Sequence, residues 1–411
     1  MATTEPSSPF GVTSEVAPLE CVLVHAPDLA LRRLTPSTCR EYLFDQVLWV
    51  DRAIEEHATF VDALVGRGVE VLHFRDLLRE TMEQPEARAW LLDHAFTEVR
   101  YGVEARTLRR GLAELDSDRL TTYLLGGLTL GEVPFRVGGL LAACLGPDDF
   151  LLPPLPNHLF MRDSSFWIGE DVWLGAMANP ARRPETLNLR AVYRFHPHFE
   201  RAHPRAWRPV HDRSGGVATI EGGDVLVVNE HCVVVGMGER TTPQAVELLA
   251  ARLFAGGRVR EVLAAELPRE RATMHLDTVL TFADRDAVCT FPQVVDRMRV
   301  WSLTAARGGD GLAVHPEYDL LGALARVLGV ERLRVVTTGG DRLQAEREQW
   351  EDGNNLLALE PGVVVAYERN AATNAKLEAE GIEVVRIRGS ELSKGRGGAR
   401  CMTCPLRRVE R

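Results

Sequence analysis

Two stretches of this chain follow the same pattern, GGDVLVVNEHCVVVGMGERTTPQAVELLAARL at 222–253 and DGNNLLALEPGVVVAYERNAATNAKLEAEG at 352–381. Each begins with a turn rich in Gly or Asn, continues as two apolar runs around a polar turn, and ends in a helical pattern. Two short apolar runs separated by turn residues predict a β-hairpin. Each stretch therefore predicts one hairpin–helix unit, and the chain uses that unit at least twice.

Two further segments have the composition of hairpins, WIGEDVWLG at 167–175 and MHLDTVLTFADRDAVCTFP at 274–292. Near the start of the chain, LECVLVHAP, a helical pattern over 51–68 and VEVLHF predict a strand, a helix and a strand. Repeated units of this kind are typical of a ring or propeller, in which strand ends and loops converge on a central channel. We therefore expect an α/β fold of that type.

Residues 76–148 have a different character. RDLLRETMEQPEARAWLLDHAF, VEARTLRRGLAELDSDRLTTYLLGGL and VGGLLAACLG predict several helices and few strands. The proline-rich stretch PDDFLLPPLPNH then ends this pattern. We expect a helical insertion at 76–148 within an α/β body formed by 1–75 and 149–411.

Composition and charge argue against several classes of protein. The chain has 411 residues, and its 58 Asp and Glu against 48 Lys and Arg give a net charge of −10, which disfavours nucleic-acid binding. No apolar run has the length of a membrane span, and the polar first residues do not predict a signal peptide. The seven scattered cysteines are typical of reduced thiols. We expect a cytoplasmic protein that binds neither nucleic acid nor membranes.

Two short motifs combine carboxylates or histidine with turn residues. EGGD at 221–224 places two acids beside a tight turn, but taken alone it is more typical of an ordinary hairpin turn with solvated acids. In MHLD, a strand would put His275 and Asp277 on one face, where a carboxylate raises the pKa of the imidazole. The alternative is a partly buried histidine with one hydrogen-bond partner. A third acid, Asp163 in NHLFMRDSS, has no local feature that distinguishes it from a solvated loop residue.

The C-terminal segment GRGGARCMTCP carries Cys401 and Cys404 after a Gly-rich loop. Exposed backbone N–H groups and neighbouring arginines favour a thiolate at Cys401. A zinc site would need a second pair of ligands, and a thioredoxin-type motif would need a following helix; the sequence offers neither. One cysteine, one histidine and several carboxylates suit nucleophilic catalysis on a cationic carbon, and carboxylates match the donor fork of a guanidinium.

The segments NHLFMRD, EGGD, MHLDT, WEDGNN…PGVVVAYERN and GRGGARCMTCP, taken in this order, resemble the arginine deiminase family. The resemblance runs from about residue 19 to the C-terminus. It implies a five-bladed, pseudo-symmetric α/β propeller with an inserted α-helical bundle. It also implies hydrolysis of L-arginine to citrulline and ammonia with no metal or organic cofactor, and we expect a homo-oligomer, either a dimer or a tetramer.

The resemblance also assigns roles to residues. Cys401 would be the nucleophile, His275 the acid and base, and Glu221 its partner, while Asp163 and Asp277 would hold the guanidinium. Residues expected to bind the remainder of the substrate are Asn157, Phe160, Arg182, Asp224, Arg240 and Arg396. Cys404 is expected to pack within the loop.

Two other classes of function remain open from the sequence. One is another guanidine-modifying enzyme, such as an agmatine deiminase, a dimethylarginine hydrolase or an amidinotransferase. The other is a catalytically silent arginine-binding protein. The arginines expected to bind a carboxylate argue against agmatine, and the presence of Cys401 argues against a silent binder, because binding needs the acids but not the thiol.

Overall fold

The computed structural model describes residues 9–200, 207–209, 218–308 and 311–410. In five of its sheets, two antiparallel strands are followed by a strand that joins the second of them in parallel. The antiparallel pairs are β6–β7 (Ser165–Ile168, Asp171–Leu174), β9–β10 (Val225–Asn229, Cys232–Met237), β12–β13 (Leu280–Asp284, Ala287–Thr290), β17–β18 (Leu357–Glu360, Val363–Tyr367) and β20–β2 (Thr403–Arg408, Cys21–Val24). The parallel strands are β8 (Trp207–Pro209), β11 (Glu261–Glu266), β16 (Arg334–Thr337), β19 (Glu383–Ile387) and β3 (Glu70–His73).

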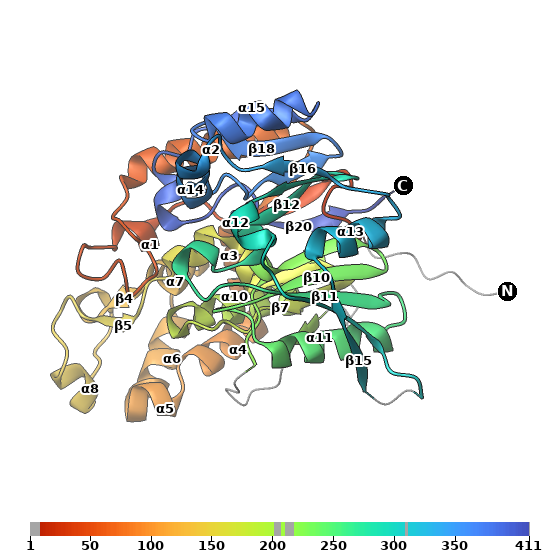
Figure 1. Cartoon of the computed structure of the whole chain (residues 1–411). Helices are drawn as coiled ribbons and strands as arrows, with labels where there is room; N and C mark the ends of the chain where they lie inside the picture. The colour runs from red at the N-terminus through yellow and green to blue at the C-terminus, as the bar shows by residue number, and fades with distance from the viewer. Residues whose placement is uncertain (1–8, 201–206, 210–217, 309–310, 411) are drawn as a thin grey trace.

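A helix connects the second and third strand of each unit, as a parallel connection requires. These helices are α10 (Arg183–Phe195), α11 (Pro243–Ala255), α13 (Leu320–Leu328), α15 (Ala371–Ala379) and α2 (Val50–Val65). In Figure 1, α11, α13 and α15 lie on the outside of the molecule, with the strands of their units toward its middle. The repeat predicted from 222–253 and 352–381 is confirmed as β9–β10–α11 and β17–β18–α15, and the two further hairpins are β6–β7 and β12–β13.

One unit brings the two ends of the chain together. Strand β20, near the C-terminus, pairs with β2 and also with β1 (Gly11–Val12). The connection from β13 to β16 contains two additional strands, β14 (Val300–Ala305) and β15 (Leu312–Glu317). These strands pair within the sheet of β9, β10 and β11. The short helix α12 (Pro292–Val295) precedes β14.

The strands are apolar on both faces because each face packs against a different core. In β10, Val233 and Val235 belong to the core that includes α11, whereas Val234 belongs to a second core with α13. In β18, Val364 lies in that second core, and Val363 and Val365 lie in a third. A strand buried on both faces explains the unbroken VVV runs, in which no polar residue alternates.

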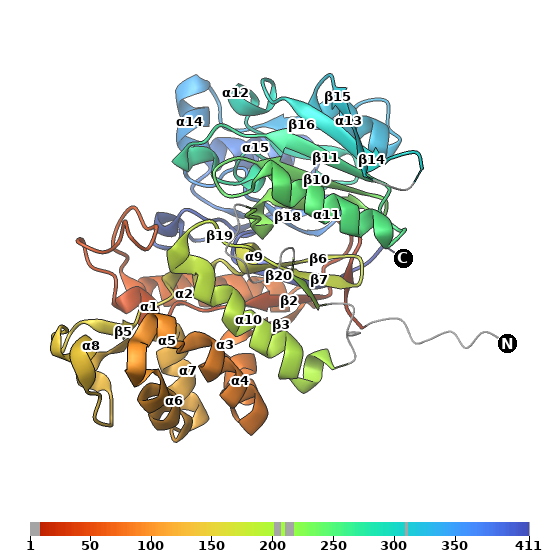
Figure 2. The same ribbon diagram turned by 90° about the horizontal axis from the view of Figure 1, so that it is seen from below.

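The region from 74 to 152 is mainly helical, as the sequence predicts. Its helices are α3 (Phe74–Met82), α4 (Pro85–Ala95), α5 (Glu98–Tyr101), α6 (Ala105–Ala113), α7 (Ser117–Gly126) and α8 (Gly139–Ala143), and its one strand pair is β4–β5 (Leu128–Thr129, Phe150–Leu152). Figures 1 and 2 show α4 to α8 gathered at one end of the molecule. No helix in the described ranges combines the length and apolar character needed to cross a bilayer.

The loop that leads to the C-terminal segment is held by one buried carboxylate of α2. Glu56 is 1% exposed and accepts hydrogen bonds from the backbone N–H groups of Ser390, Glu391 and Leu392 and from the Ser390 hydroxyl, at 2.6 to 3.2 Å. It therefore fixes residues 390–392, which precede the Gly-rich loop.

We predict that Glu56→Ala lowers the free energy of unfolding by about 3 kcal/mol, because three buried N–H groups lose their acceptor. The measurement is urea unfolding followed by circular dichroism. Glu55→Ala is the matched control, since the Glu55 side chain is 67% exposed and pairs only with Arg52 among the contacts described. Equal effects of the two substitutions would contradict the prediction.

Candidate active site

The repeat places the candidate catalytic side chains at one equivalent position, shortly before the first strand of a unit. Asp163 precedes β6 in the short helix α9 (Met161–Ser164). Glu221 precedes β9, where EGGD forms a 3₁₀ turn at Gly222–Asp224. His275 and Asp277 precede β12, and Cys401 precedes β20. The candidate catalytic residues, distant in the sequence, therefore come from four different units and meet in one place.

Cys401 lies at the centre of this cluster and is 4% exposed. Its backbone N–H donates to Oδ1 of Asn355 at 2.9 Å, and Asn355 in turn donates to the carbonyl of Asp277. The Cys401 Sγ is 3.5 Å from Oδ2 of Asp277. Burial, together with the negative charges of Asp277 and Asp163, raises the pKa of the Cys401 thiol well above its usual value. The resting nucleophile is a neutral thiol.

His275 is bound between two carboxylates. Its Nε2 is 2.8 Å from Oε2 of Glu221, and its Nδ1 is 3.6 Å from Oδ1 of Asp163. Burial alone would lower the pKa of this imidazole, but Asp163 and Glu221 raise it to about 9. Burial would raise the pKa of Glu221, but the hydrogen bond from His275 and the charge of Arg240 lower it to about 2. The pair is a protonated imidazole beside an ionised carboxylate.

The structure corrects the local geometry expected for MHLD. His275 is extended, but Leu276–Thr278 form a 3₁₀ turn and the strand begins only at Leu280. The turn directs Asp277 to Cys401, and the carboxylates that set the pKa of His275 are Asp163 and Glu221. A histidine and an acid two residues apart thus serve two different partners.

The glycines of EGGD are required by close packing, and neither has a positive φ. A Cβ at Gly222 would lie 2.0 Å from the carbonyl oxygen of Arg162. A Cβ at Gly223 would lie 2.7 Å from the ring of His275 and 2.8 Å from Oδ1 of Asp163. Any larger residue would displace the histidine or the acid.

Asp163 and Asp277 each have one carboxylate oxygen bound to an arginine and one without a hydrogen bond. Oδ2 of Asp163 accepts from Arg182 at 2.6 Å, and Oδ2 of Asp277 accepts from Arg400 at 2.8 Å. Oδ1 of each acid is buried and accepts no hydrogen bond among the described residues, although Oδ1 of Asp163 faces Nδ1 of His275 at 3.6 Å. A buried carboxylate oxygen without a donor is costly, so the two free oxygens form a site for a cation with N–H groups.

A small cavity lies at this cluster. The residues lining it are Leu43, Asn157, Phe160, Asp163, Arg182, Arg240, Arg271, Met274, His275, Thr278, Gly395, Arg396 and Cys401. Its free volume is only about 10 Å³, about the space of one water molecule. The cavity is therefore too small for an amino-acid substrate unless lining side chains move.

The arginines expected to bind a carboxylate differ in their freedom to do so. Arg182 donates to Asp163, to both oxygens of Glu185 and to the carbonyls of Asn157 and Phe160, so it fixes the wall of the site. Arg240 has a weaker contact, 3.5 Å from Glu221.

Arg396 has a left-handed backbone conformation, with φ of 63°. Its guanidinium carbon lies 3.7 Å from the ring centre of Trp350, whose carbonyl accepts a hydrogen bond from the same arginine. Its second carbonyl partner is that of Ala272, and stacking with two carbonyl contacts leaves Arg396 freer than Arg182 to turn toward a ligand.

The remaining expected contacts have different outcomes. The Asn157 amide donates to the carbonyl of Tyr42 at 2.7 Å, while Phe160 packs against Gly395 and Gly397 beside the nucleophile. Asp224 lies outside the cavity lining, and its oxygens bind the N–H of Leu276 and the Thr241 hydroxyl. Asp277 and Glu221 are likewise outside that lining. In this structure Asp224 anchors the turn that carries His275, and its expected contact with the substrate stays a prediction.

The sequence reasoning missed several residues of the site. Arg271 lines the cavity and donates to the carbonyl of Leu43, and its position three residues before MHLD was the available signal. Glu185 lies one helical turn after Arg182, a spacing typical of an ion pair. Asn355 stands in the quoted WEDGNN block, but no local pattern indicates that it holds Cys401.

Asp163, Glu221 and His275 place ligand atoms within 4.8 Å of one another, a spacing compatible with a metal ion. However, a protonated His275 has no free ring nitrogen to act as a ligand, and Arg182 already forms an ion pair with Asp163. The charges of this group are better matched to a hydrogen-bonding cation in the adjacent cavity.

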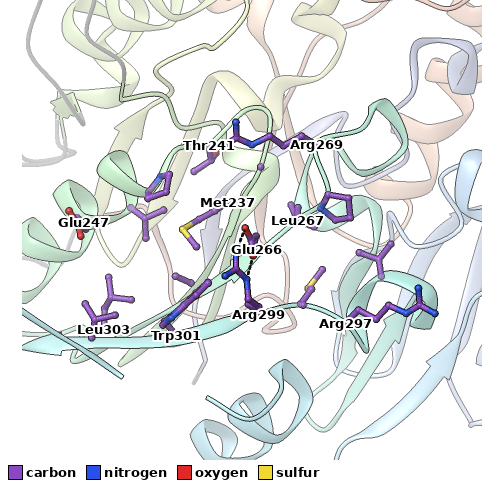
Figure 3. A pocket seen from close by; sticks show the side chains of 18 of the residues that line it. Met237, Thr241, Glu247, Glu266, Leu267, Arg269, Arg297, Arg299, Trp301 and Leu303 are labelled. Atoms are coloured by element: carbon purple, nitrogen blue, oxygen red, sulfur yellow. Dashed lines mark hydrogen bonds and ion pairs between the residues drawn. The ribbon is translucent and has the colours of Figure 1, made fainter. Parts of the chain in front are cut away.

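A larger pocket, of about 920 Å³, lies apart from these residues between α11, β11 and β14. Figure 3 shows its mainly apolar lining, with Met237, Leu267 and Trp301, and the ion pair between Arg299 and Glu266. No cysteine or histidine lines it. The cysteine and histidine suited to catalysis line the small buried cavity instead.

Comparison with known proteins identifies the family and the fold of the chain. A family model described as arginine deiminase matches residues 40–408. Among solved structures, the fold is similar to SxtG, an amidinotransferase from Microseira wollei in the saxitoxin pathway, with 13% identity, a TM-score of 0.59 and 98% of each chain covered.

Two further solved structures show the same likeness. DDAH from Pseudomonas aeruginosa in complex with citrulline has 13% identity and a TM-score of 0.51, with 94% of this chain and 98% of that chain covered. The N-terminal domain of ArgZ, covalently bonded to a reaction intermediate, has 13% identity and a TM-score of 0.51, with 93% and 96% covered. At these identities the likeness shows a shared mixed α/β fold.

We predict that the His275 imidazole remains protonated above pH 8 and that Glu221→Gln lowers its pKa by about one unit or more, because the stabilising anion is lost. The measurement is NMR titration of ¹⁵N-histidine-labelled protein, with the signal assigned by His275→Gln. Glu239→Gln is the control, since Glu239 touches Arg240 but not His275. A resting pKa near 6.5 would refute this assignment.

Proposed function

Because the chain belongs to the arginine deiminase family, whose model matches residues 40–408, we propose that it hydrolyses L-arginine to L-citrulline and ammonia. The observation that carries the proposal is the pair of buried Oδ1 atoms of Asp163 and Asp277 that accept no hydrogen bond, on two acids whose charges both act on Cys401. Two such acceptors match the N–H groups of a planar guanidinium and would hold its carbon near the sulfur.

Binding of the substrate cation would activate the nucleophile. The negative charges that raise the pKa of the Cys401 thiol are those of Asp277 and Asp163, after burial itself. A bound guanidinium neutralises these charges, so the thiol pKa falls once the substrate is in place. The thiol proton passes to solvent, and the thiolate then attacks the guanidinium carbon and forms a tetrahedral adduct.

The protonated His275 supplies the proton for the leaving nitrogen, and ammonia departs to leave a Cys401 thiouronium. The neutral imidazole next removes a proton from water, which attacks the thiouronium carbon. Collapse of the second adduct expels the Cys401 thiolate and gives citrulline, while the remaining hydroxyl proton passes to solvent. Glu221 stabilises the imidazolium form before and after this cycle.

Selection of the amino-acid end would depend on arginines that can move. Arg240, Arg271 and Arg396 line the cavity, and a forked donor is suited to an α-carboxylate. Arg182 has nearly all its donors engaged, so we assign it to holding Asp163. Entry of arginine into a cavity with room for one water requires Arg396 and its loop to shift away from Trp350.

We also propose that the five strand units form the five-bladed propeller, with residues 1–75 and 149–411 as its body and 76–148 as the inserted helical part. The equal strand pattern of the five sheets and the pairing of β20 with β2 support this arrangement. A cytoplasmic location and a homo-oligomeric state remain predictions of the sequence.

We predict that purified protein converts L-arginine, but not agmatine, into a ureido product and ammonia, with EDTA present throughout. Agmatine lacks the carboxylate that Arg240, Arg271 and Arg396 would bind. The measurement is colorimetric detection of citrulline with a coupled ammonia assay. Product from agmatine would move the protein to another guanidine-modifying activity, and none from either substrate would favour a silent binder.

We predict that Cys401→Ala abolishes turnover while arginine binding, measured by calorimetry, stays within about fivefold of that of the wild type, since the carboxylates that hold the cation remain. Wild-type enzyme quenched with acid during turnover should carry an adduct on Cys401 with the mass of arginine less ammonia. Cys404→Ala is the control, because the Cys404 sulfur contacts Ser165 outside the cavity. Residual turnover in Cys401→Ala would exclude the thiol mechanism.

A further inference from the structure

Arg400, the residue before the nucleophile, carries a buried charge that the reaction steps above do not use. It is 1% exposed, and its Nη1 donates to Oδ2 of Asp277 at 2.8 Å. Its Nη2 donates to the carbonyl of Val225 at 2.8 Å. The remaining contacts are a two-point ion pair with Glu15, at 3.0 Å from Nε and 3.1 Å from Nη2.

Glu15 comes from the other end of the chain and has no direct contact with the cavity. Its side chain is 11% exposed, and Oε1 also accepts from the N–H of Val227 at 3.3 Å. Burial would raise the pKa of Glu15, but the charges of Arg400 and Arg162 lower it to about 2. It is therefore a fixed anion whose charge faces the same arginine that binds Asp277.

Glu15 is one of the two carboxylates that bind Arg400, in a region that holds two further buried arginines. Arg162 and Arg408 are buried nearby, and Arg408 donates to the Glu15 carbonyl. Without the Glu15 carboxylate, the full charge of Arg400 would act on Asp277 and on the sulfur of Cys401. Asp277 would then attract a substrate cation less, and the surroundings of Cys401 would become more positive.

We propose that Glu15 is a positioning residue of the active site: through Arg400 it sets how much of the negative charge of Asp277 remains for the substrate guanidinium. This inference rests on the proposed function, because it names the support for the guanidinium-binding acid. The N-terminal segment thus supplies a charge that the C-terminal nucleophile needs, and the sheet of β1, β2 and β20 keeps the two ends together.

The test compares Glu15→Gln with Glu20→Gln, a control from the same segment whose partner Arg407 lies away from the cavity. Two readouts are used: the KM for L-arginine, and the rate ratio of Cys401 alkylation by anionic iodoacetate and neutral iodoacetamide at one pH. Labelling is quantified on the peptide that contains Cys401, because Cys144 is exposed and would contribute to a total label count. Loosening of the structure accelerates both reagents alike, whereas a more positive site favours the anionic one.

We expect Glu15→Gln to raise KM about tenfold and to raise the iodoacetate to iodoacetamide ratio about fivefold, with Glu20→Gln at wild-type values. Glu15→Asp, which keeps the charge, should retain the wild-type ratio while KM rises, and it serves if the Gln variant does not fold. An unchanged ratio in Glu15→Gln, or an equal shift in Glu15→Asp, overturns the proposal. The ratio needs no turnover, so its result is separable from a failure of the proposed function.

Discussion

The structure depends on one electrostatic constraint, the burial of several carboxylates around a single thiol. Asp163 and Asp277 each give one oxygen to a buried arginine and keep the other free of donors among the described residues. A fully paired carboxylate would have no affinity left for a substrate, and an unpaired one would be too costly to bury in the ionised form. Pairing one oxygen of each acid with a buried arginine leaves the other oxygen for the guanidinium that we propose as substrate.

The fold meets this constraint by repetition. Each unit presents the residues before its first strand to the same region, so acids, histidine and cysteine from distant segments meet without a long functional loop. The antiparallel pairing of β20 with β2 is what adds the nucleophile, because Cys401 stands two residues before β20. The same pairing explains how an acid near residue 15 reaches an arginine near residue 400.

The repeated units and their hairpins could be predicted from the sequence because both depend on local patterns of apolar and turn residues. The resemblance indicated the cluster of Cys401, His275, Glu221 and the two acids, but local patterns could not show which carboxylate binds which partner. His275 pairs with Glu221, 54 positions away, and not with its neighbour Asp277. Such partners are set by how the units pack, which leaves no periodic signal in the chain.

The arginines of the site divide according to how completely their donors are satisfied. Arg182 and Arg400 each bind two carboxylates, so they are fixed and tune the acids beside the reacting carbon. Arg396 stacks on an aromatic ring and binds backbone carbonyls, contacts that cost less to break than a buried ion pair. Under the proposed function, a substrate carboxylate entering a cavity with room for about one water would compete with these weaker contacts. Specificity at the amino-acid end and opening of the site would then both depend on the Arg396 guanidinium.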